Sequence, residues 1–383
     1  MKRIAVFGGS FDPVHNEHVS LVKAAIEGLG LDKLYVMPAF APPHKPGKNL
    51  SPDSDRLEMC RLAFENLPQA EVSDYEIARG GTSYTYLTCA HFKEKYPNAE
   101  IFWLVGTDML RDFPTWKYPE KILDCATLAV CARNEKGGWL QNEQESFYQK
   151  FGRNFAVIGY NGADVSSTKI RVLAGAGMDL TSFLPEKIAA YIQKKGLYEI
   201  SGANTALALE KPERAAHSLR VAELAASRAV SLKISEKKAI AAALFHDCAK
   251  NLSPNAPYLN GFVLHDEWGN IPEPVLHQYT GAYVAETHFG VADGDILNAI
   301  RYHTSARPNM SELEKLIFLA DMLESARNYR GVDELRTLFW DKEGLDKCLA
   351  EALYQTLLFL KEKGGEIYPL TRAAYEFYKD KRK

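Results

Sequence analysis

Two groups of residues in this chain have side chains suited to nucleotide chemistry, and they lie far apart in the sequence. The first runs from Gly8 to His18 and combines two glycines, a serine and two histidines. The second is the adjacent pair His246 and Asp247. Exposed N–H groups suit the binding of phosphate, whereas a neighbouring imidazole and carboxylate suit the binding of a metal ion. The separation predicts two catalysts joined in one chain.

The first group places a glycine turn before a helix start. Gly8 and Gly9 follow a short apolar strand, and without Cβ atoms they let backbone amides approach a phosphate closely. A helix expected to begin near Asn16 favours an anion through its N-terminal amides and dipole. His15 and His18 can project to one side and donate N–H groups to a phosphate whose charge grows in the transition state. The alternative is a tight turn followed by an ordinary helix cap.

A second set of hydroxyl donors occurs later, in the run from Val165 to Arg171. Ser166, Ser167 and Thr168 precede an amphipathic helix, and the guanidinium of Arg171 follows them. This is either a second phosphate cradle or an N-cap cluster. Each of these two motifs alone more often has only a structural role. Their occurrence in this order along one domain favours a role in phosphate binding.

The C-terminal half contains a candidate metal site. His246 and Asp247 follow an apolar helix, His217 lies one predicted helix earlier, and Asp321 lies within the apolar run 317–323. A single histidine or aspartate at such a position is usually a hydrogen-bonded polar residue or a helix cap. Burying the Asp321 carboxylate without a cation, however, would be costly in free energy. These four residues form a nitrogen and oxygen set that suits iron, manganese or zinc, and their spacing does not choose among them.

The order of predicted elements divides the chain into two fold classes. Strand candidates alternate with amphipathic helices in the first part, at residues 4–7, 33–37, 71–74, 101–105, 127–131 and 154–159. Such alternation predicts a Rossmann-like α/β domain with a parallel sheet covered on both faces. From about Glu213 onward the pattern is almost entirely helical, which predicts an all-α domain. We expect domains at 1–199 and 209–383, joined by a linker at 200–208 that begins around Ser201 and Gly202.

Composition restricts the function classes. The 383 residues are 46% hydrophobic and 25% charged, as in ordinary soluble domains, and the net charge of -3 provides no global field for nucleic acid or an acidic membrane. No apolar run approaches the roughly 18 residues of a spanning helix. The six cysteines are scattered without a CxxC motif, which is typical of reduced core thiols and predicts a cytoplasmic protein. The oligomeric state is left open, with a homodimer as one option.

Residues 1–199 resemble the bacterial nicotinate-nucleotide adenylyltransferases, a nucleotidyltransferase family marked by a GxFxPxHxxH loop and a late SSTxIR motif. Further matches occur in family order at residues 42–45, 56–59, 83–85, 106–108 and Trp116. One position departs from the pattern, because Glu17 stands where most members of the family carry glycine. At a first helical turn a carboxylate is compatible with the helix dipole, so we expect Glu17 to be tolerated.

This resemblance implies transfer of AMP from ATP to nicotinate mononucleotide, with Mg²⁺ as cofactor and deamido-NAD and pyrophosphate as products. His15 and His18 would hold the reacting α-phosphate. The other ATP-binding residues implied by the resemblance are Gly8, Gly9, Ser10, Lys45, Asp108, Ser167, Thr168 and Arg171. Thr85 and Trp116 would recognise the nicotinate ring, and this likeness favours the acid over the amide substrate.

Residues from about Arg214 to Arg336 resemble HD-domain phosphohydrolases, most closely the YqeK-type symmetrical diadenosine tetraphosphatases. Four blocks in order carry the resemblance, at residues 217–221, 246–250, 299–304 and 313–321. Two departures are Ser305-Ala306, where Thr-Gly is usual, and Pro212 shortly before His217. The class of hydrolase is therefore better supported than its substrate.

The second resemblance implies an iron-dependent hydrolase, or one using another divalent transition metal, that splits diadenosine tetraphosphate into two ADP. Its metal ligands would be His217, His246, Asp247 and Asp321, with Asp247 and Lys250 assisting catalysis. Residues matching those that hold the nucleotide are Arg214, His277, His303, Thr304 and Arg327. His277 and His303 are alternatively ligands of a second metal.

Together these inferences predict a bifunctional enzyme whose partners are ATP, nicotinate mononucleotide and diadenosine tetraphosphate, with no nucleic-acid or membrane partner. The alternative is an active adenylyltransferase joined to an HD module that hydrolyses another nucleotide or only senses nucleotides.

Overall fold

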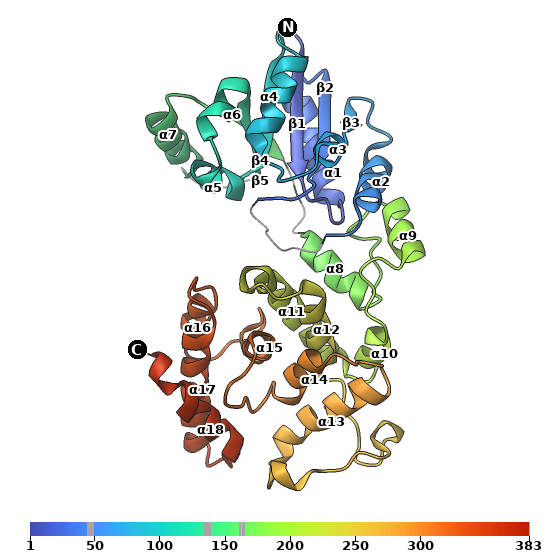
Figure 1. Cartoon of the computed structure of the whole chain (residues 1–383), viewed down its shortest axis with the longest axis vertical. Helices are drawn as coiled ribbons and strands as arrows, with labels where there is room; N and C mark the ends of the chain where they lie inside the picture. The colour runs from blue at the N-terminus through green and yellow to red at the C-terminus, as the bar shows by residue number, and fades with distance from the viewer. Residues whose placement is uncertain (44–49, 134–138, 161, 163–164, 383) are drawn as a thin grey trace. The chain divides into compact units, whose positions relative to one another are not determined.

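The computed structural model describes residues 1–43, 50–133, 139–160, 162 and 165–382, and it divides into two compact units (Figure 1). Unit 1 comprises the described residues up to Ile170 together with Leu180–Leu197. Unit 2 comprises Arg171–Asp179 and the described residues from Tyr198 onward. Each unit has its own buried core.

Unit 1 is built on a six-stranded sheet in the order β3-β2-β1-β4-β5-β6, in which all neighbouring strands are parallel. Its strands are β1 (Arg3–Gly9), β2 (Lys33–Pro38), β3 (Ala70–Val72), β4 (Glu100–Gly106), β5 (Thr127–Arg133) and β6 (Ala156–Tyr160). The centres of β1 and β4 are fully buried, as expected for a sheet covered on both faces. The predicted α/β fold and its six strands are confirmed.

Helices connect these strands: α1 (Asn16–Leu29), α2 (Asp53–Phe64), α3 (Tyr75–Arg79), α4 (Thr85–Lys95), α5 (Thr107–Asp112), α6 (Pro119–Cys125) and α7 (Trp139–Phe151). After β6 follow α8 (Ser167–Gly175), which belongs to unit 2 from Arg171 onward, and α9 (Glu186–Lys195) of unit 1. Helix α1 buries Leu21, Val22, Ala25 and Leu29 along one face and ends at Gly30 in the left-handed conformation. Strand β1 lies between β2 and β4, so the order of connections reverses there. In such sheets, ligands bind beyond the carboxyl ends of the strands at this switch point.

Unit 2 is helical throughout its described residues, with short 3-10 turns between the helices. Its helices are α10 (Ala203–Ala208), α11 (Pro212–Ala229), α12 (Glu236–Phe245), α13 (Glu273–Thr287), α14 (Gly294–Arg301), α15 (Glu312–Leu323), α16 (Val332–Phe339), α17 (Asp346–Glu362) and α18 (Pro369–Tyr378). From Ala239 to Phe245, helix α12 is buried on all sides, which is typical of a helix at the centre of a core. The predicted all-α half is confirmed.

The region expected to be a linker differs from the prediction. Residues 203–208 form α10, and Ala203, Ala206 and Leu207 are buried in the core of unit 2. Their spacing gives the short helix one apolar face, so it packs instead of spanning a gap. Pro212 occupies the first turn of α11, where proline has no hydrogen bond to lose, so it does not shorten that helix before His217.

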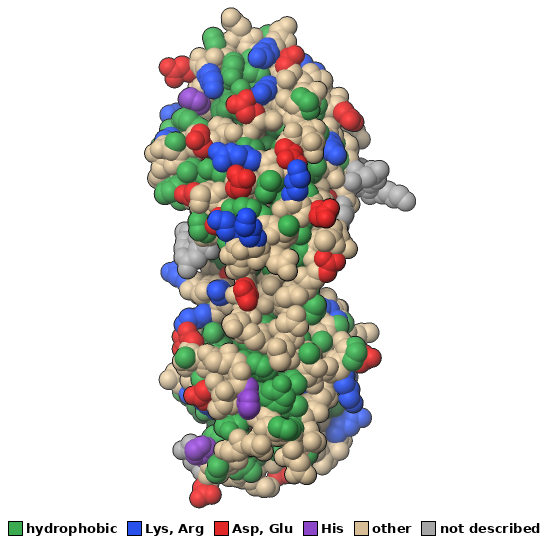
Figure 2. Space-filling model, turned by 90° about the vertical axis from the view of Figure 1, so that its right-hand side faces the viewer, with side chains coloured by type: hydrophobic (Ala, Val, Ile, Leu, Met, Phe, Trp, Pro, Cys, Tyr) green, Lys and Arg blue, Asp and Glu red, His purple; other side chains and the backbone are tan. Residues whose placement is uncertain are grey.

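Surface features are ordinary. On the face drawn in Figure 2, basic and acidic side chains are interspersed. Within the part of the chain that the structure describes, no helix has the length and apolar character needed to cross a bilayer.

Candidate active sites

The loop after β1 depends on glycine for packing. A Cβ on Gly8 would lie 2.9 Å from the indole of Trp103, and one on Gly9 would lie 3.0 Å from the ring of Phe11. A side chain at either position would therefore displace a buried aromatic ring. The backbone of this loop emerges at the carboxyl end of β1, at the switch point of the sheet.

His15 and His18 lie together at the start of α1. Their ring centroids are 3.7 Å apart, and His15 is the N-cap residue. The backbone N–H of His15 donates to Nδ1 of His18 at 3.1 Å. Because Nδ1 accepts this bond, the proton of a neutral His18 ring lies on Nε2.

The phosphate loop is anchored by a residue whose role the sequence alone did not indicate. Arg56 on α2 is completely buried and donates to the carbonyl oxygens of Ser10 at 2.8 Å and Ser51 at 3.3 Å, and it also pairs with Asp53. Arg56 belongs to a block that matches the adenylyltransferase pattern, but only the tertiary contacts reveal that it fixes the backbone of Ser10.

The early and late phosphate motifs meet in unit 1. The hydroxyl of Ser167, at the start of α8, donates to the carbonyl of Pro13 at 3.0 Å. Ser166 caps the helix, since its hydroxyl accepts from the N–H of Lys169 at 3.1 Å. Thr168 lies in the first turn of α8. The motif therefore caps α8 and contacts the histidine loop, and its role as a phosphate cradle stays a prediction.

Arg171 is placed differently from its neighbours in the motif. It is 6% exposed and its Nε donates to Glu236 of α12 at 2.8 Å. Both residues belong to unit 2. A phosphate that binds Arg171 must compete with this carboxylate.

A pocket of about 430 Å³ contains both residues expected to recognise the nicotinate ring. Thr85 begins α4, and Trp116 packs against Phe113 with ring centroids 5.4 Å apart. The other lining residues include Tyr84 and Lys117, whose ammonium group lies 4.3 Å from the Tyr84 ring centroid. The pocket thus offers an aromatic surface with a cation at its wall.

Asp108 and Lys45 are two further ATP-binding candidates from the sequence. The side chain of Asp108, on α5, is 90% exposed and lies 4.0 Å from Arg111. Lys45 lies outside the described residues.

Glu17 does not face solvent. It is 5% exposed, and its carboxylate accepts a hydrogen bond of 2.7 Å from the hydroxyl of Tyr160 at the end of β6. The carboxylate that distinguishes this chain from most adenylyltransferases is therefore directed toward β6.

In unit 2, residues from five parts of the helical fold converge on one buried cluster. The groups able to hold a metal ion are His217 with His246 and Asp247, His246 with His303 and Asp321, and Asp247 with His277 and His303. Within each group the ligand atoms lie within 4.8 Å of one another. The four predicted ligands are therefore brought together, and the two additional histidines lie beside them.

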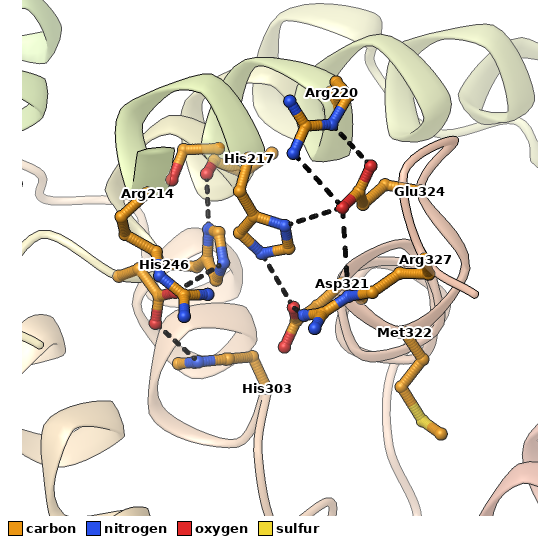
Figure 3. A network of polar contacts seen from close by, with 12 residues as sticks. Arg214, His217, Arg220, His246, His303, Asp321, Met322, Glu324 and Arg327 are labelled. Carbon is orange, nitrogen blue, oxygen red and sulfur yellow. Dashed lines mark hydrogen bonds and ion pairs between the residues drawn. The ribbon is translucent and has the colours of Figure 1, made fainter. Parts of the chain in front are cut away.

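The orientation of the imidazoles favours a cation. The Nδ1 atoms of His246 and His303 lie 2.6 Å and 2.7 Å from the carbonyl oxygens of Ala243 and Ile300, so these nitrogens carry protons. His217 presents Nδ1 to Glu324, and its Nε2 lies 2.9 Å from Asp321 (Figure 3). The buried Nε2 atoms of His217 and His246 have no hydrogen-bond partner among the described residues. Unprotonated nitrogens beside carboxylate oxygens repel unless a positive charge lies between them, so this donor set fits a metal.

The pKa values of the cluster residues agree with the binding of a metal ion. Burial alone would lower the pKa of His246, but the carboxylate of Asp247 outweighs it and raises that pKa to about 9. Burial likewise opposes ionisation of Asp321, yet His217 and His246 hold its pKa far below the usual range. The carboxylates thus remain charged and the site attracts positive charge, supplied by a proton or by a metal.

His277, His303 and Thr304 form a second layer on Asp247. His277 Nε2 lies 3.2 Å from an oxygen of Asp247 and 3.1 Å from His303 Nε2. The hydroxyl of Thr304 lies 3.1 Å and 3.0 Å from the same two nitrogens. Burial lowers the pKa of His303 to about 4, so its ring is neutral near pH 7. Both roles considered for these histidines, phosphate contact or second-metal ligand, are compatible with this arrangement.

Cations surround the carboxylates of the cluster. Arg214 and Lys250 lie 3.0 Å and 3.3 Å from Asp247, and Arg327 lies 2.6 Å from Asp321. Each of these three side chains is about one-third exposed, at 30%, 30% and 37%. A polyphosphate entering the site would meet them before it reached the buried ligands.

Comparisons with known proteins match both halves. The cytidylyltransferase-like family model matches residues 6–173, and the HD domain model matches residues 214–326. A protein of Mycoplasma genitalium, named a probable nicotinate-nucleotide adenylyltransferase/Ap4A hydrolase, is 32% identical over 329 residues that cover 85% of this chain and 88% of that protein. The chain belongs to the family of these adenylyltransferase/Ap4A hydrolases.

Single-domain relatives match the halves of this family member separately. A probable nicotinate-nucleotide adenylyltransferase of Clostridium tetani is 35% identical over 199 residues, covering 52% of the chain and 100% of that protein. A crystal structure of a predicted HD superfamily hydrolase involved in NAD metabolism, from Clostridium acetobutylicum, is 36% identical and covers 47% of the chain and 96% of its own, with a TM-score of 0.42.

Two polar residues of the HD half were missed from the sequence. Glu324 contacts His217 and Arg220, and Glu210 is buried beside Ser218, whose hydroxyl donates to it at 2.9 Å. Burial raises the pKa of Glu210 to about 7. Glu324 lies one turn beyond Asp321, and that spacing was its only signal in the sequence.

Proposed function

We propose that this protein catalyses two reactions, with the adenylyltransferase in residues 1–199 and the hydrolase in residues 209–383. The first transfers AMP from ATP to nicotinate mononucleotide. The second hydrolyses diadenosine tetraphosphate to two ADP. The names of the Mycoplasma relatives support the pairing of these activities. We also propose a cytoplasmic location, supported by six free cysteines of which five are buried.

In the first reaction a phosphate oxygen of the mononucleotide attacks the α-phosphorus of ATP. The bond from that phosphorus to the oxygen bridging the β-phosphate breaks, and pyrophosphate leaves. No enzyme nucleophile is required, so the protein contributes positioning and charge stabilisation. We assign His18, His15 beside it and the hydroxyl of Thr168 to the phosphates, together with Mg²⁺. Ser167 would join them after its hydroxyl releases the carbonyl of Pro13.

The remaining assignments for ATP follow the family pattern. Gly8, Gly9 and Ser10 would contribute backbone contacts, and Arg56 supports them by fixing the carbonyl of Ser10.

Asp108 would bind the ribose of ATP through its exposed carboxylate. Lys45 and Arg171 would bind the outgoing phosphates, Arg171 after release from Glu236.

The pocket around Trp116 supports nicotinate as the preferred base. An indole provides a surface on which a pyridine ring can stack, and Thr85 provides a polar contact at the wall. Lys117 adds a positive charge to the same wall, which suits the carboxylate of nicotinate better than the neutral amide of nicotinamide.

The converging Nε2 atoms and carboxylates of unit 2 are the observation that carries the second activity. We assign His217, His246, Asp247 and Asp321 to a divalent transition metal, with iron as our choice. When bound, such an ion lowers the pKa of water and polarises phosphoryl oxygens. Arg214, Lys250 and Arg327 would orient the tetraphosphate, and His277, His303 and Thr304 would hold its phosphates or a second ion.

One substitution in each domain of the full chain, with both activities measured in each variant, tests both proposals. We expect His18→Ala to abolish pyrophosphate release from ATP and nicotinate mononucleotide while sparing hydrolysis, and Asp247→Ala to have the opposite effect. His91→Ala and Asp333→Ala are matched controls, because His91 stacks on Tyr75 and the Asp333 side chain is 90% exposed.

Analysis of the hydrolysis products tests whether diadenosine tetraphosphate is the substrate of the HD domain. Iron-loaded protein given diadenosine tetraphosphate alone should yield ADP as the sole product by nucleotide chromatography. Formation of ATP plus AMP would instead show asymmetric cleavage of the same dinucleotide, and no turnover would assign the HD half to another nucleotide or to sensing.

A further inference from the structure

His217 is held from both sides by carboxylates with different surroundings. Its Nε2 lies 2.9 Å from Asp321 within the metal cluster, while its Nδ1 lies 3.1 Å from Glu324, which belongs to none of the groups able to hold a metal (Figure 3). The imidazole itself is 6% exposed. One nitrogen is thus available for the metal, and the other is occupied by a residue behind it.

Glu324 is itself held firmly. One of its oxygens accepts hydrogen bonds from Arg220 Nε at 2.6 Å and from the backbone N–H of Ala326 at 2.7 Å. Its side chain is 3% exposed, and Arg336 donates to its backbone carbonyl at 2.9 Å. A carboxylate surrounded by these donors is ionised and can only accept, so the proton between Glu324 and His217 belongs to Nδ1 of the imidazole.

We propose that Glu324 is a positioning residue for the metal site, which fixes His217 in the tautomer whose Nε2 faces the cluster. This inference rests on the proposed metal-binding role of unit 2. His246 and His303 do not need such a residue, because backbone carbonyls within their own turns hold their Nδ1 atoms.

A purely structural role for Glu324, as the partner of Arg220, predicts something different. In that case its removal would weaken the fold without changing the affinity of the folded protein for a metal. Glu314 provides the comparison, because it lies in the first turn of α15, the helix that Glu324 directly follows, is 1% exposed and pairs with Arg307 at 2.6 Å. Glu314 also caps α15 by accepting from the N–H of Ser311, and it belongs to none of the three groups found among the described residues.

The test compares zinc affinity in Glu324→Gln, Glu314→Gln and wild-type full-length protein, by competition with a chromophoric chelator. Loss of a partner behind a metal-ligating histidine typically weakens binding by 10–100-fold. We expect the dissociation constant for Zn²⁺ to rise by about tenfold or more in Glu324→Gln, and to stay within about twofold of wild type in Glu314→Gln. Equal affinities for Glu324→Gln and wild type would overturn the inference, whereas a wild-type protein that binds no zinc would overturn the metal site itself.

A second measurement needs no folded Glu324 variant. In zinc-loaded protein with ¹⁵N-labelled histidines, the imidazole signal lost in His217→Ala identifies His217. We expect a protonated Nδ1 and a zinc-bound Nε2 in the wild type. A zinc-bound Nδ1, or a rapid mixture of tautomers, would contradict the role assigned to Glu324.

Discussion

The hydroxyl of Tyr160 donates a hydrogen bond of 2.7 Å to the carboxylate of Glu17. Glu17 lies between the two histidines of the phosphate loop and is 5% exposed. A buried carboxylate without donors costs several kcal/mol in effective terms, so a donor from β6 makes this residue compatible with the loop.

Replacing Tyr160 with phenylalanine removes that donor and leaves the ring in place. We expect Tyr160→Phe to lower the free energy of unfolding of unit 1 by about 1–3 kcal/mol, because an acceptor loses a partner. Urea denaturation of the full chain measures this, with Tyr148→Phe as control, since Tyr148 is 56% exposed on α7. Equal denaturation midpoints for the two variants would show that the bond contributes nothing measurable.

Glu76 should make the stability of unit 1 depend on pH. This carboxyl is 3% exposed and accepts from Thr88 at 2.5 Å, and burial raises its pKa above the ordinary value of 4.5. The folded state therefore holds a proton that the unfolded state releases, so this contribution to stability is present at low pH and is lost as pH rises through the raised pKa. Glu76→Gln should flatten that decline in urea denaturation across pH, and an unchanged slope would contradict it.

Metal addition should stabilise unit 2. A ligand that binds only the folded state at 100 times its dissociation constant adds about 2.7 kcal/mol. We expect Zn²⁺ to raise the thermal midpoint of the metal-depleted chain, and Asp321→Asn to remove most of this gain. A zinc-induced rise of the same size in Asp321→Asn would exclude Asp321 as a ligand.

Arg56 should matter for ATP binding without touching ATP. Arg56→Lys retains the charge but cannot donate to Ser10 and Ser51 together, so the loop backbone loses a buried donor. We expect the KM for ATP to rise at least severalfold. Arg61→Lys is the matched control on the same helix, because its side chain is 58% exposed. Similar KM values in both variants would refute the anchoring role.

The sequence predicted the elements of unit 1 well because of the way parallel sheets bury their strands. Runs such as residues 4–7 and 101–105 are apolar throughout, and turn residues bound them, so each strand could be located on its own. The linker prediction failed at Ala203 because small residues suit loops and packed helices equally, and only contact with the core distinguishes the two cases.

Site residues with recognisable chemistry were found more readily than the residues that orient them. His217 and Asp321 could be singled out because a histidine and an aspartate in apolar helices are unusual. Glu324 and Arg56 act through contacts that the fold creates, and charged residues of these types are common on any surface. Likewise, nothing near Arg171 in the sequence indicates its pairing with Glu236, which lies 65 residues further along the chain.

Three of the four histidines in the metal cluster acquire their orientations at different points in synthesis. His246 and His303 each bond a carbonyl three residues earlier, so a growing chain can set their rings as soon as the local turns form. The partner of His217, Glu324, lies 107 residues further along the chain and is therefore synthesised later. A nascent chain therefore emerges from the ribosome with an incomplete site, and it gains full capacity to retain a metal only after α15 has docked against α11.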